Sequence, residues 1–136
     1  MYYVIKGDPI PLSRARIGHG ARHVYDCQRE AKRICAIHIQ NQRGEDPLVG
    51  GPIHLDITFF MRIPKVAQKN VENKRFQYHY YKPDISNLIK FLEDVSNRIL
   101  FNDDSQIAYI TARKVYDKEP RTEFSITPLK EKYQTP

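Results

Sequence analysis

The sequence has only two cysteines and no long run of apolar residues among its 136 positions. Cys27 and Cys35 do not form a CxxC pair, so neither a disulfide framework nor a zinc knuckle is indicated, and we interpret both as reduced, partly buried thiols on one helix. No segment approaches the length of a membrane span, and the first 20 residues lack the apolar core of a signal peptide. These absences predict a soluble, cytoplasmic protein.

The length and composition fit one globular domain. A chain of 136 residues with 40% hydrophobic content can bury a modest core but has no room for a second domain. We place that domain at residues 1–129 and expect residues 130–136 to form a flexible C-terminal tail.

Charge is distributed unevenly along the chain, whose net charge is +6. Residues 14–33 carry six bases against two acids and residues 62–82 carry six against one, whereas residues 84–104 carry five acids against two bases. Clustered carboxylates repel a polyanion and weaken simple phosphate binding. A nuclease needs them, because they hold a divalent metal at the scissile phosphate. For the basic stretches, an ordinary solvated face remains an open alternative.

Hydrophobic periodicity predicts two helices separated by strands, in the order β-α-β-α-β-β. Residues 2–5 are β-like, and Asp26 can cap a helix that runs to about Gln42. The apolar stripe of that helix is predicted to comprise Cys27, Ala31, Ile34, Cys35 and His38. The clearest strand lies at residues 53–63, where apolar and polar side chains alternate.

The second half of the chain is predicted to begin with a loop and to continue with a helix and two strands. Residues 65–82 are polar, basic and then aromatic, and they indicate a long mobile loop that we expect to order in part on binding. A helix with one buried and one polar face should start at Asp84. Residues 106–116 and 122–127 are predicted strands. Together the pattern predicts an α+β fold with a small mixed sheet packed by two helices.

Two segments at the ends of the second predicted helix carry candidate site residues, KPDISNLIK at residues 82–90 and NDDSQI at residues 102–107. A helix followed by a returning chain can bring its start close to the next strand, so we expect Asp84 and Asp104 to share one metal site. Mg²⁺ takes one or two carboxylates together with several waters, which this arrangement can supply.

Lys90 lies about one turn beyond Ser86 on the polar face of this helix. Its ammonium group can meet the charge that develops on a phosphoryl oxygen, or it can orient the attacking water. In the alternative interpretation, Asp84 only caps the helix, and Asp103 and Asp104 only form a turn.

These two segments resemble the signature of the RusA family of Holliday-junction resolvases, which pairs Pro-Asp-x-Asp-Asn-Leu-x-Lys with a downstream Asp-Asp-x-Gln-Ile. The matching residues are Pro83, Asp84, Asn87, Leu88 and Lys90, followed by Asp103, Asp104, Gln106 and Ile107. The resemblance extends to residues 25–26, 53–63 and 113–123, and so covers most of the chain. It implies a homodimeric endodeoxyribonuclease that uses Mg²⁺, with Mn²⁺ as a substitute, to make paired nicks across a four-way DNA junction.

Carried over position by position, the resemblance implies that Asp84, Lys90 and Asp104 are catalytic. It implies that Asp84, Asp104 and the neighbouring Asp103 bind the metal, and that Asn87 shapes the helix start. A homodimer suits a two-fold symmetric junction that is cut at two equivalent phosphates in DNA recombination and repair. RusA-like genes often travel with prophages, so a phage origin is consistent with the resemblance.

Ser86 departs from the family pattern, which has a second Asp at this position. A hydroxyl is a much weaker ligand than a carboxylate for a hard divalent cation. Three explanations remain open: the change is compensated by Asp103 or Asp94, it is inactivating, or it was introduced so that substrate is bound without being cut. A catalytically impaired branched-DNA-binding protein is therefore an alternative function, and a basic RNA-associated module is another.

Phosphate contacts are expected from the basic stretches, and they should bind the DNA backbone without reading its sequence. The expected contacts are Arg14, Arg16, Arg22, Arg29, Arg33, Lys69, Lys74, Arg75 and Lys82. The aromatic residues 78–81 can stack on bases unpaired at a junction centre, or they can pack in a strand or a dimer interface. We do not predict a zinc site at His19 and His23, because the flanking glycines indicate a loop and no partner ligand is evident.

Overall fold

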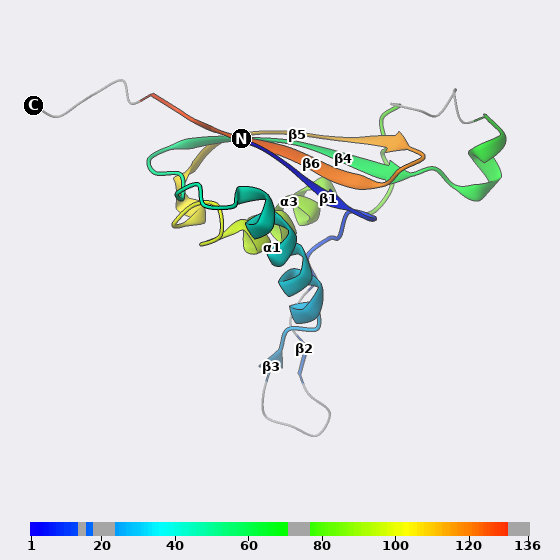
Figure 1. Ribbon diagram of the computed structural model, residues 1–136. Coiled ribbons are helices and arrows are strands. Elements are labelled where there is room, and N and C mark those ends of the chain that lie inside the picture. Colours follow the sequence, from blue (N-terminus) through cyan, green and yellow to red (C-terminus); the bar gives the residue numbers. More distant parts are fainter. Residues whose placement is uncertain (14–15, 18–23, 71–76, 131–136) are drawn as a thin grey trace, which may run out of the picture.

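A four-stranded mixed sheet with both long helices on one of its faces forms the framework of this computed structural model, which describes residues 1–13, 16–17, 24–70 and 77–130 (Figure 1). The strands are β1 (Tyr2–Lys6), β4 (Ile53–Arg62), β5 (Ile107–Asp117) and β6 (Arg121–Pro128), in the spatial order β1-β6-β4-β5. β4 and β5 are parallel, and the other neighbouring strands are antiparallel. The prediction of an α+β domain with a small mixed sheet packed by two helices is confirmed.

The remaining elements are helices and one short hairpin. The helices are α1 (Arg29–Arg43), α3 (Ile85–Ser96) and the short 3-10 helices η1 (Lys65–Asn70) and η2 (Asp104–Gln106). β2 (Arg16–Ile17) and β3 (Val24–Tyr25) pair as a hairpin that projects beyond the start of α1 (Figure 1). The sequence did not predict this hairpin, because two-residue strands carry no periodic signal. Each of the four longer strands agrees with its predicted range to within one residue at either end.

Alternate residues of β4 form the centre of the hydrophobic core. Ile53, Ile57 and Phe59 are at most 1% exposed, and they belong to one cluster with Leu88 and Leu92 of α3. The alternation of buried and half-buried residues over positions 53–59 puts these side chains on the sheet face that the helices cover. The strand and the buried side of α3 were both predicted correctly, because each follows a simple hydrophobic period.

The connection from β4 through α3 to β5 decides where the two ends of α3 lie. Because β4 and β5 are parallel, the chain must return along the sheet between them, and α3 makes that return. The start of α3 therefore lies beside the second half of β5, where Lys114 Nζ donates a 2.7 Å hydrogen bond to the carbonyl oxygen of Pro83. The end of α3 lies near the entry to β5.

α1 starts two residues later than predicted, with Gln28 and not Asp26 at the cap position. Asp26 does not cap it; its carboxylate accepts a 2.9 Å hydrogen bond from the Gln28 amide in the preceding turn. The side chain of Gln28 is bonded to Ser13 N and Pro11 O, which ties this turn to the loop after β1. Tertiary contacts of Gln28 therefore decide the start of the helix.

The buried face of α1 also differs from the predicted stripe. Cys35 and Ile39 are buried, whereas Ile34 and His38 are exposed, and Cys27 lies in the turn before the helix with its thiol exposed. The two cysteines are free, as predicted, but they are not on one helix. α1 packs along a narrow contact with α3 and β1, so only part of its apolar surface is covered.

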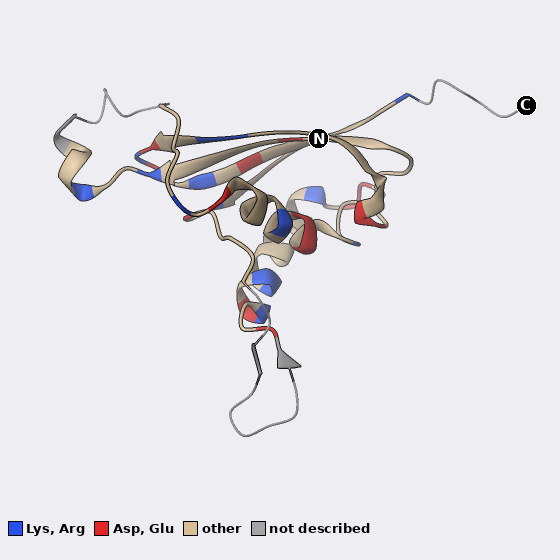
Figure 2. Ribbon diagram, turned by 180° about the vertical axis from the view of Figure 1, so that it is seen from behind, with Lys and Arg blue, Asp and Glu red and all other residues tan. Residues whose placement is uncertain are grey.

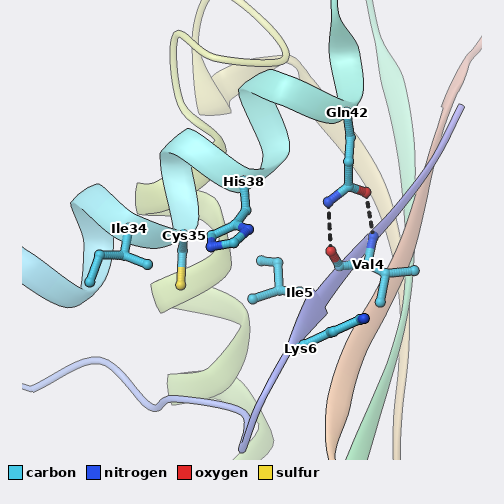
Figure 3. A pocket seen from close by; sticks show the side chains of 7 residues that line it. All are labelled: Val4, Ile5, Lys6, Ile34, Cys35, His38 and Gln42. Carbon is cyan, nitrogen blue, oxygen red and sulfur yellow. Dashed lines mark hydrogen bonds between the residues drawn. The ribbon is translucent and has the colours of Figure 1, made fainter.

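A side chain from α1 closes part of the outer edge of β1. The Gln42 amide accepts a 2.9 Å hydrogen bond from Val4 N and donates a 2.7 Å hydrogen bond to Val4 O (Figure 3). Beside this contact, a pocket between α1 and β1 is lined by residues that include Cys35, His38 and Lys6 (Figure 3). Unpaired edge strands tend to pair with other chains, and Gln42 satisfies one residue of this edge within the domain.

The predicted loop at residues 65–82 is more regular than expected in its described parts. It begins with η1, and residues 77–79 pair with the outer edge of β5 through hydrogen bonds from Tyr116 N to Gln77 O (2.8 Å) and from His79 N to Lys114 O (2.9 Å). Residues 71–76 lie outside the described residues, as do residues 131–136 of the predicted tail. Ordering of the loop on binding stays a prediction.

Candidate functional site

The carboxylate of Asp84 is exposed at the start of α3 and does not cap the helix. The residue has an extended backbone, and its carbonyl oxygen accepts the amide hydrogen bonds of Asn87 (3.1 Å) and Leu88 (3.3 Å). Among the described residues, its side chain has no hydrogen-bond or ion-pair partner. The interpretation of Asp84 as only a helix cap is therefore not supported, and its carboxylate is free to bind a ligand.

Lys114 lies directly behind this helix start, and the sequence did not single it out. Its Nζ donates 2.7 Å hydrogen bonds to the carbonyl oxygens of Tyr81 and Pro83, the residues that lead into Asp84. Burial lowers the pKa of Lys114, and the negative charge of Asp84 acts in the opposite direction. Lys114 therefore fixes the backbone of residues 81–83 before α3 and places a cation near the Asp84 carboxylate. In the sequence it is one of three charged residues of β5, with Arg113 and Asp117, so nothing distinguished it.

Lys90 and Asp84 lie on one surface along the first turns of α3. Two shallow depressions that share Leu12 and Asn87 follow this surface; one also includes Lys82 and Asp84, and the other includes Lys90. The loop after β1 forms one wall, because Leu12 N donates a 2.9 Å hydrogen bond to Asn87 O. The backbone of Asn87 thus joins the helix start to this loop, which is consistent with its predicted shaping role.

Ser86 is exposed on the same helix start, and its side chain has no hydrogen-bond partner among the described residues. No structural role in the described part of the chain therefore requires a serine at this position. An aspartate could occupy the position without displacing a contact, and it is well tolerated near a helix N-terminus.

The second motif segment is built around Gln106 and Asp103. The Gln106 side chain accepts hydrogen bonds from the amides of Asn102 (2.9 Å) and Asp103 (3.0 Å), and it donates to the carbonyl oxygens of Val49 (3.0 Å) and Gly51 (2.9 Å). The Asp103 carboxylate accepts a 3.0 Å hydrogen bond from Ser105 N, and its pKa is lowered first by the Ser105 side chain and then by this backbone bond. Asp103 therefore caps η2, and its proposed metal-binding role has to compete with this bond.

Asp104 is exposed and acts electrostatically on Glu93 near the end of α3. Burial first, and then the charges of Asp104 and Asp94, raise the pKa of Glu93, while Lys90 lowers it. The Asp104 carboxylate itself has no hydrogen-bond or ion-pair partner in the part of the chain that the structure describes. Glu93 is a half-buried carboxyl group that the sequence placed only on the polar face of the helix.

No hydrogen bond or ion pair joins Asp84 and Asp104 within the described part of one chain, so their shared site stays a prediction. Asp84 precedes α3 and Asp104 follows it, and the helix has 12 residues, which corresponds to about 18 Å. Because α3 itself makes the return between the parallel strands β4 and β5, its end lies near the first residues of β5. In the described ranges, no group of three His, Cys, Asp or Glu side chains could hold a metal ion. A magnesium site needs only one or two carboxylates together with several waters, so the exposed Asp84 carboxylate remains a candidate ligand.

The predicted phosphate-binding residues are only partly described. Arg14, Arg22, Lys74 and Arg75 lie outside the described residues, as do His19 and His23, and the side chains of Arg16 and Lys69 are also not described. Arg29, Arg33 and Lys82 are exposed. Arg33 is partly neutralised by Glu30, whose carboxylate lies 2.6 Å from its guanidinium. Figure 2 shows basic and acidic positions together on the first turns of α1, and an acidic segment in the turn after α3.

Comparison with known proteins identifies the family of the chain. The family model described as Endodeoxyribonuclease RusA matches residues 6–127. The uncharacterized protein YqaN of Bacillus subtilis (strain 168) is 27% identical over 133 residues, which cover 91% of this chain and 93% of YqaN. The crossover junction endodeoxyribonuclease rusA of Lactococcus phage r1t is 35% identical over 77 residues, 56% of this chain and 54% of that protein. None of the described helices is long and apolar enough to cross a membrane. The chain belongs to the RusA endodeoxyribonuclease family, as the match of its model to most of the sequence shows.

Proposed function

We propose that this chain is a Mg²⁺-dependent endodeoxyribonuclease that resolves four-way DNA junctions by paired nicks, in DNA recombination and repair. The observation that carries the proposal is the free carboxylate of Asp84, which shares one surface with Lys82 and Lys90 at the start of α3 in a RusA-family chain. The enzyme would act in the bacterial cytoplasm. The phage relative is consistent with a phage-encoded origin.

In this proposal a homodimer brings Asp84 of one protomer and Asp104 of the other to the same site. Each active site would combine Asp84 and Lys90 of one protomer with the partner's Asp104, and the carboxylates would hold Mg²⁺, or Mn²⁺ in its place. The ion would supply a Lewis acid that stabilises charge on the phosphoryl oxygens. Lys90 would stabilise the same developing charge.

The outer edge of β5 supports such a dimer. Residues 77–79 cover this edge only at residues 114–116, and no other described segment pairs with it. Tyr109 and Ile110 on the free part are 53% and 37% exposed. A strand can pair with its own two-fold copy only in antiparallel fashion. If two β5 strands paired near Tyr109, the partner's Asp104 would approach Lys114 and therefore Asp84.

Cleavage of a labelled four-way junction, with and without Mg²⁺, tests the activity. We would compare the unmodified chain with Ser86→Asp, and use a linear duplex of the same sequence as the control substrate. Paired, metal-dependent nicks by the unmodified chain would establish the resolvase. Nicks by Ser86→Asp alone would favour the alternative that this chain is a catalytically impaired branched-DNA-binding protein, an alternative that the exposed Ser86 supports. No cleavage by either, together with no preference for the junction, would refute the proposal.

Mixing two inactive variants tests the shared site. Asp84→Asn and Asp104→Asn should each abolish cleavage in a background that cuts. A heterodimer of the two has one site with both substitutions and one site with neither, so the mixture should recover nicking at a single strand. If the unmodified chain cuts and the mixture stays inactive, the shared site is wrong while the nuclease function stands.

A further inference from the structure

Three exposed tyrosines lie within residues 78–81, just before the candidate site in the sequence. Tyr78, Tyr80 and Tyr81 are 73%, 79% and 59% exposed, and they lie next to Lys82 and close to Asp84 in the sequence. Exposed aromatic rings that gather at one place usually mark a surface that another molecule covers. None of the three rings belongs to the described hydrophobic core, so they are exposed for contact with another molecule.

The segment that carries these rings is anchored at several points. Its backbone pairs with β5 through Gln77 and His79, and Lys114 Nζ binds the Tyr81 carbonyl oxygen at 2.7 Å. The ring of His79 turns inward, with its centroid 5.0 Å from that of Tyr116, and it meets the Tyr81 ring edge-on at 6.0 Å. Burial lowers the pKa of His79, which favours its neutral form against these rings. A ligand that stacks on this segment would therefore lose little affinity to ordering of the chain.

Tyr80 and Tyr81 already stack on each other. Their ring centroids are 4.6 Å apart with an interplanar angle of 25°, and their hydroxyl groups are 3.4 Å apart. A stacked pair keeps an outer ring face free for a third ring in the same orientation. With the exposed ammonium of Lys82 beside it, the pair offers a flat π-surface and a phosphate-binding cation together.

We propose that Tyr80 and Tyr81 form a stacking platform for a DNA base that is unpaired or unstacked at the branch point, next to the phosphate to be cut. This inference rests on the proposed nuclease function. Every base has a π-face, so the platform would be tolerant of sequence, whereas bases inside an intact duplex are already stacked and cannot reach it. Selectivity for branched over linear DNA therefore lies in this aromatic pair, and the basic stretches bind both forms.

Binding without cleavage tests the platform directly. In EDTA, the dissociation constants of a four-way junction and of a linear duplex are measured for the unmodified protein and for Tyr80→Ala/Tyr81→Ala. Loss of one stacked base should weaken junction binding by roughly 5- to 150-fold, which corresponds to about 1–3 kcal/mol, and leave duplex binding unchanged. Tyr80→Phe/Tyr81→Phe should bind as the unmodified protein does, because the ring faces remain. Tyr2→Ala is the matched control, since Tyr2 is 60% exposed on β1 at the other edge of the sheet.

A fluorescent base locates the contact. With 2-aminopurine at the branch point, the unmodified protein and the Phe variant should change its emission as the base stacks on tyrosine, and the Ala variant should not. Equal loss of junction and duplex binding, or no loss of either, would overturn the proposal. So would dissociation of a dimer by the Ala variant in sedimentation experiments, since the tyrosines would then contact a second copy. A protein that shows no junction preference before mutation would instead refute the proposed function.

Discussion

The two ends of α3 carry the two halves of the RusA signature, and they use their acidic residues in different ways. At the start, the Asp84 carboxylate has no hydrogen-bond or ion-pair partner among the described residues and lies near the cations Lys114 and Lys82. At the other end, Asp103 is bonded to the η2 backbone, and burial, followed by the charges of Asp104 and Asp94, raises the pKa of Glu93. A motif aspartate can therefore act in catalysis or stabilise local structure, and its hydrogen bonds distinguish the two roles.

The largest expected effect is at the start of the helix. Lys90→Met should lower the single-turnover cleavage rate by roughly 100-fold, because a cation positioned at developing phosphoryl charge is typically worth that much. Junction affinity should change little. Lys118→Met, in the exposed turn between β5 and β6, is the control and should cut normally. Equal losses in both variants would mean that Lys90 contributes only general charge.

The other end should respond mainly in stability. Gln106→Ala removes four hydrogen bonds that join residues 49–51 to the turn at residues 102–103, and it should lower the free energy of unfolding by about 2–3 kcal/mol. Urea denaturation measures this change. Gln40→Ala, at an exposed position of α1, should leave stability nearly unchanged. A stable Gln106→Ala protein would show that the turn does not depend on this side chain.

Lys114→Met should affect both activity and stability. Removing its ammonium leaves the carbonyl oxygens of Tyr81 and Pro83 without their donor, which should cost about 1–2 kcal/mol of unfolding free energy. Cleavage should fall by about tenfold, since a loosened segment positions Asp84 less well. Thermal denaturation and cleavage rates on the same preparation separate the two effects. Lys130→Met, an exposed position after β6, is the control. Unchanged cleavage would refute the positioning role of Lys114.

The smallest expected effect is a gain in stability at the acidic end. The raised pKa of Glu93 means that the folded protein keeps a proton that the unfolded chain releases above about pH 4.5. The free energy of unfolding should therefore fall as the pH rises through the interval between the two pKa values. Glu93→Gln should remove this dependence and stabilise the protein above the interval, by less than about 1 kcal/mol.

Thermal denaturation across this pH range measures the effect of Glu93→Gln. Glu119→Gln, in the exposed turn between β5 and β6, is the matched control and should keep the pH dependence of the unmodified protein. If Glu93→Gln and Glu119→Gln have the same pH profile, the crowding of acids at this end of α3 is too weak to matter.

Regular periodicity explains which parts of the fold were predictable. β4 and α3 repeat their apolar residues at periods near 2 and 3.6, so their positions and buried faces follow from the sequence. The start of α1 did not follow, because Gln28 is held by Ser13 and Pro11 from a distant loop. The buried face of α1 could not be predicted either, because its contacts with α3 and β1 cover only some of its apolar residues.

The candidate site was also predictable only in part. The sequence by itself determined the fold class, the strands, the motif residues and the family, because these depend on residue type, order and spacing. Only the tertiary structure decided that the Asp84 carboxylate has no partner among the described residues, that Asp103 caps η2, and that Lys114 supports the helix start. The physical reason is that hydrogen-bond partners and the direction of a crossover helix are set by packing between distant segments, which no local pattern encodes.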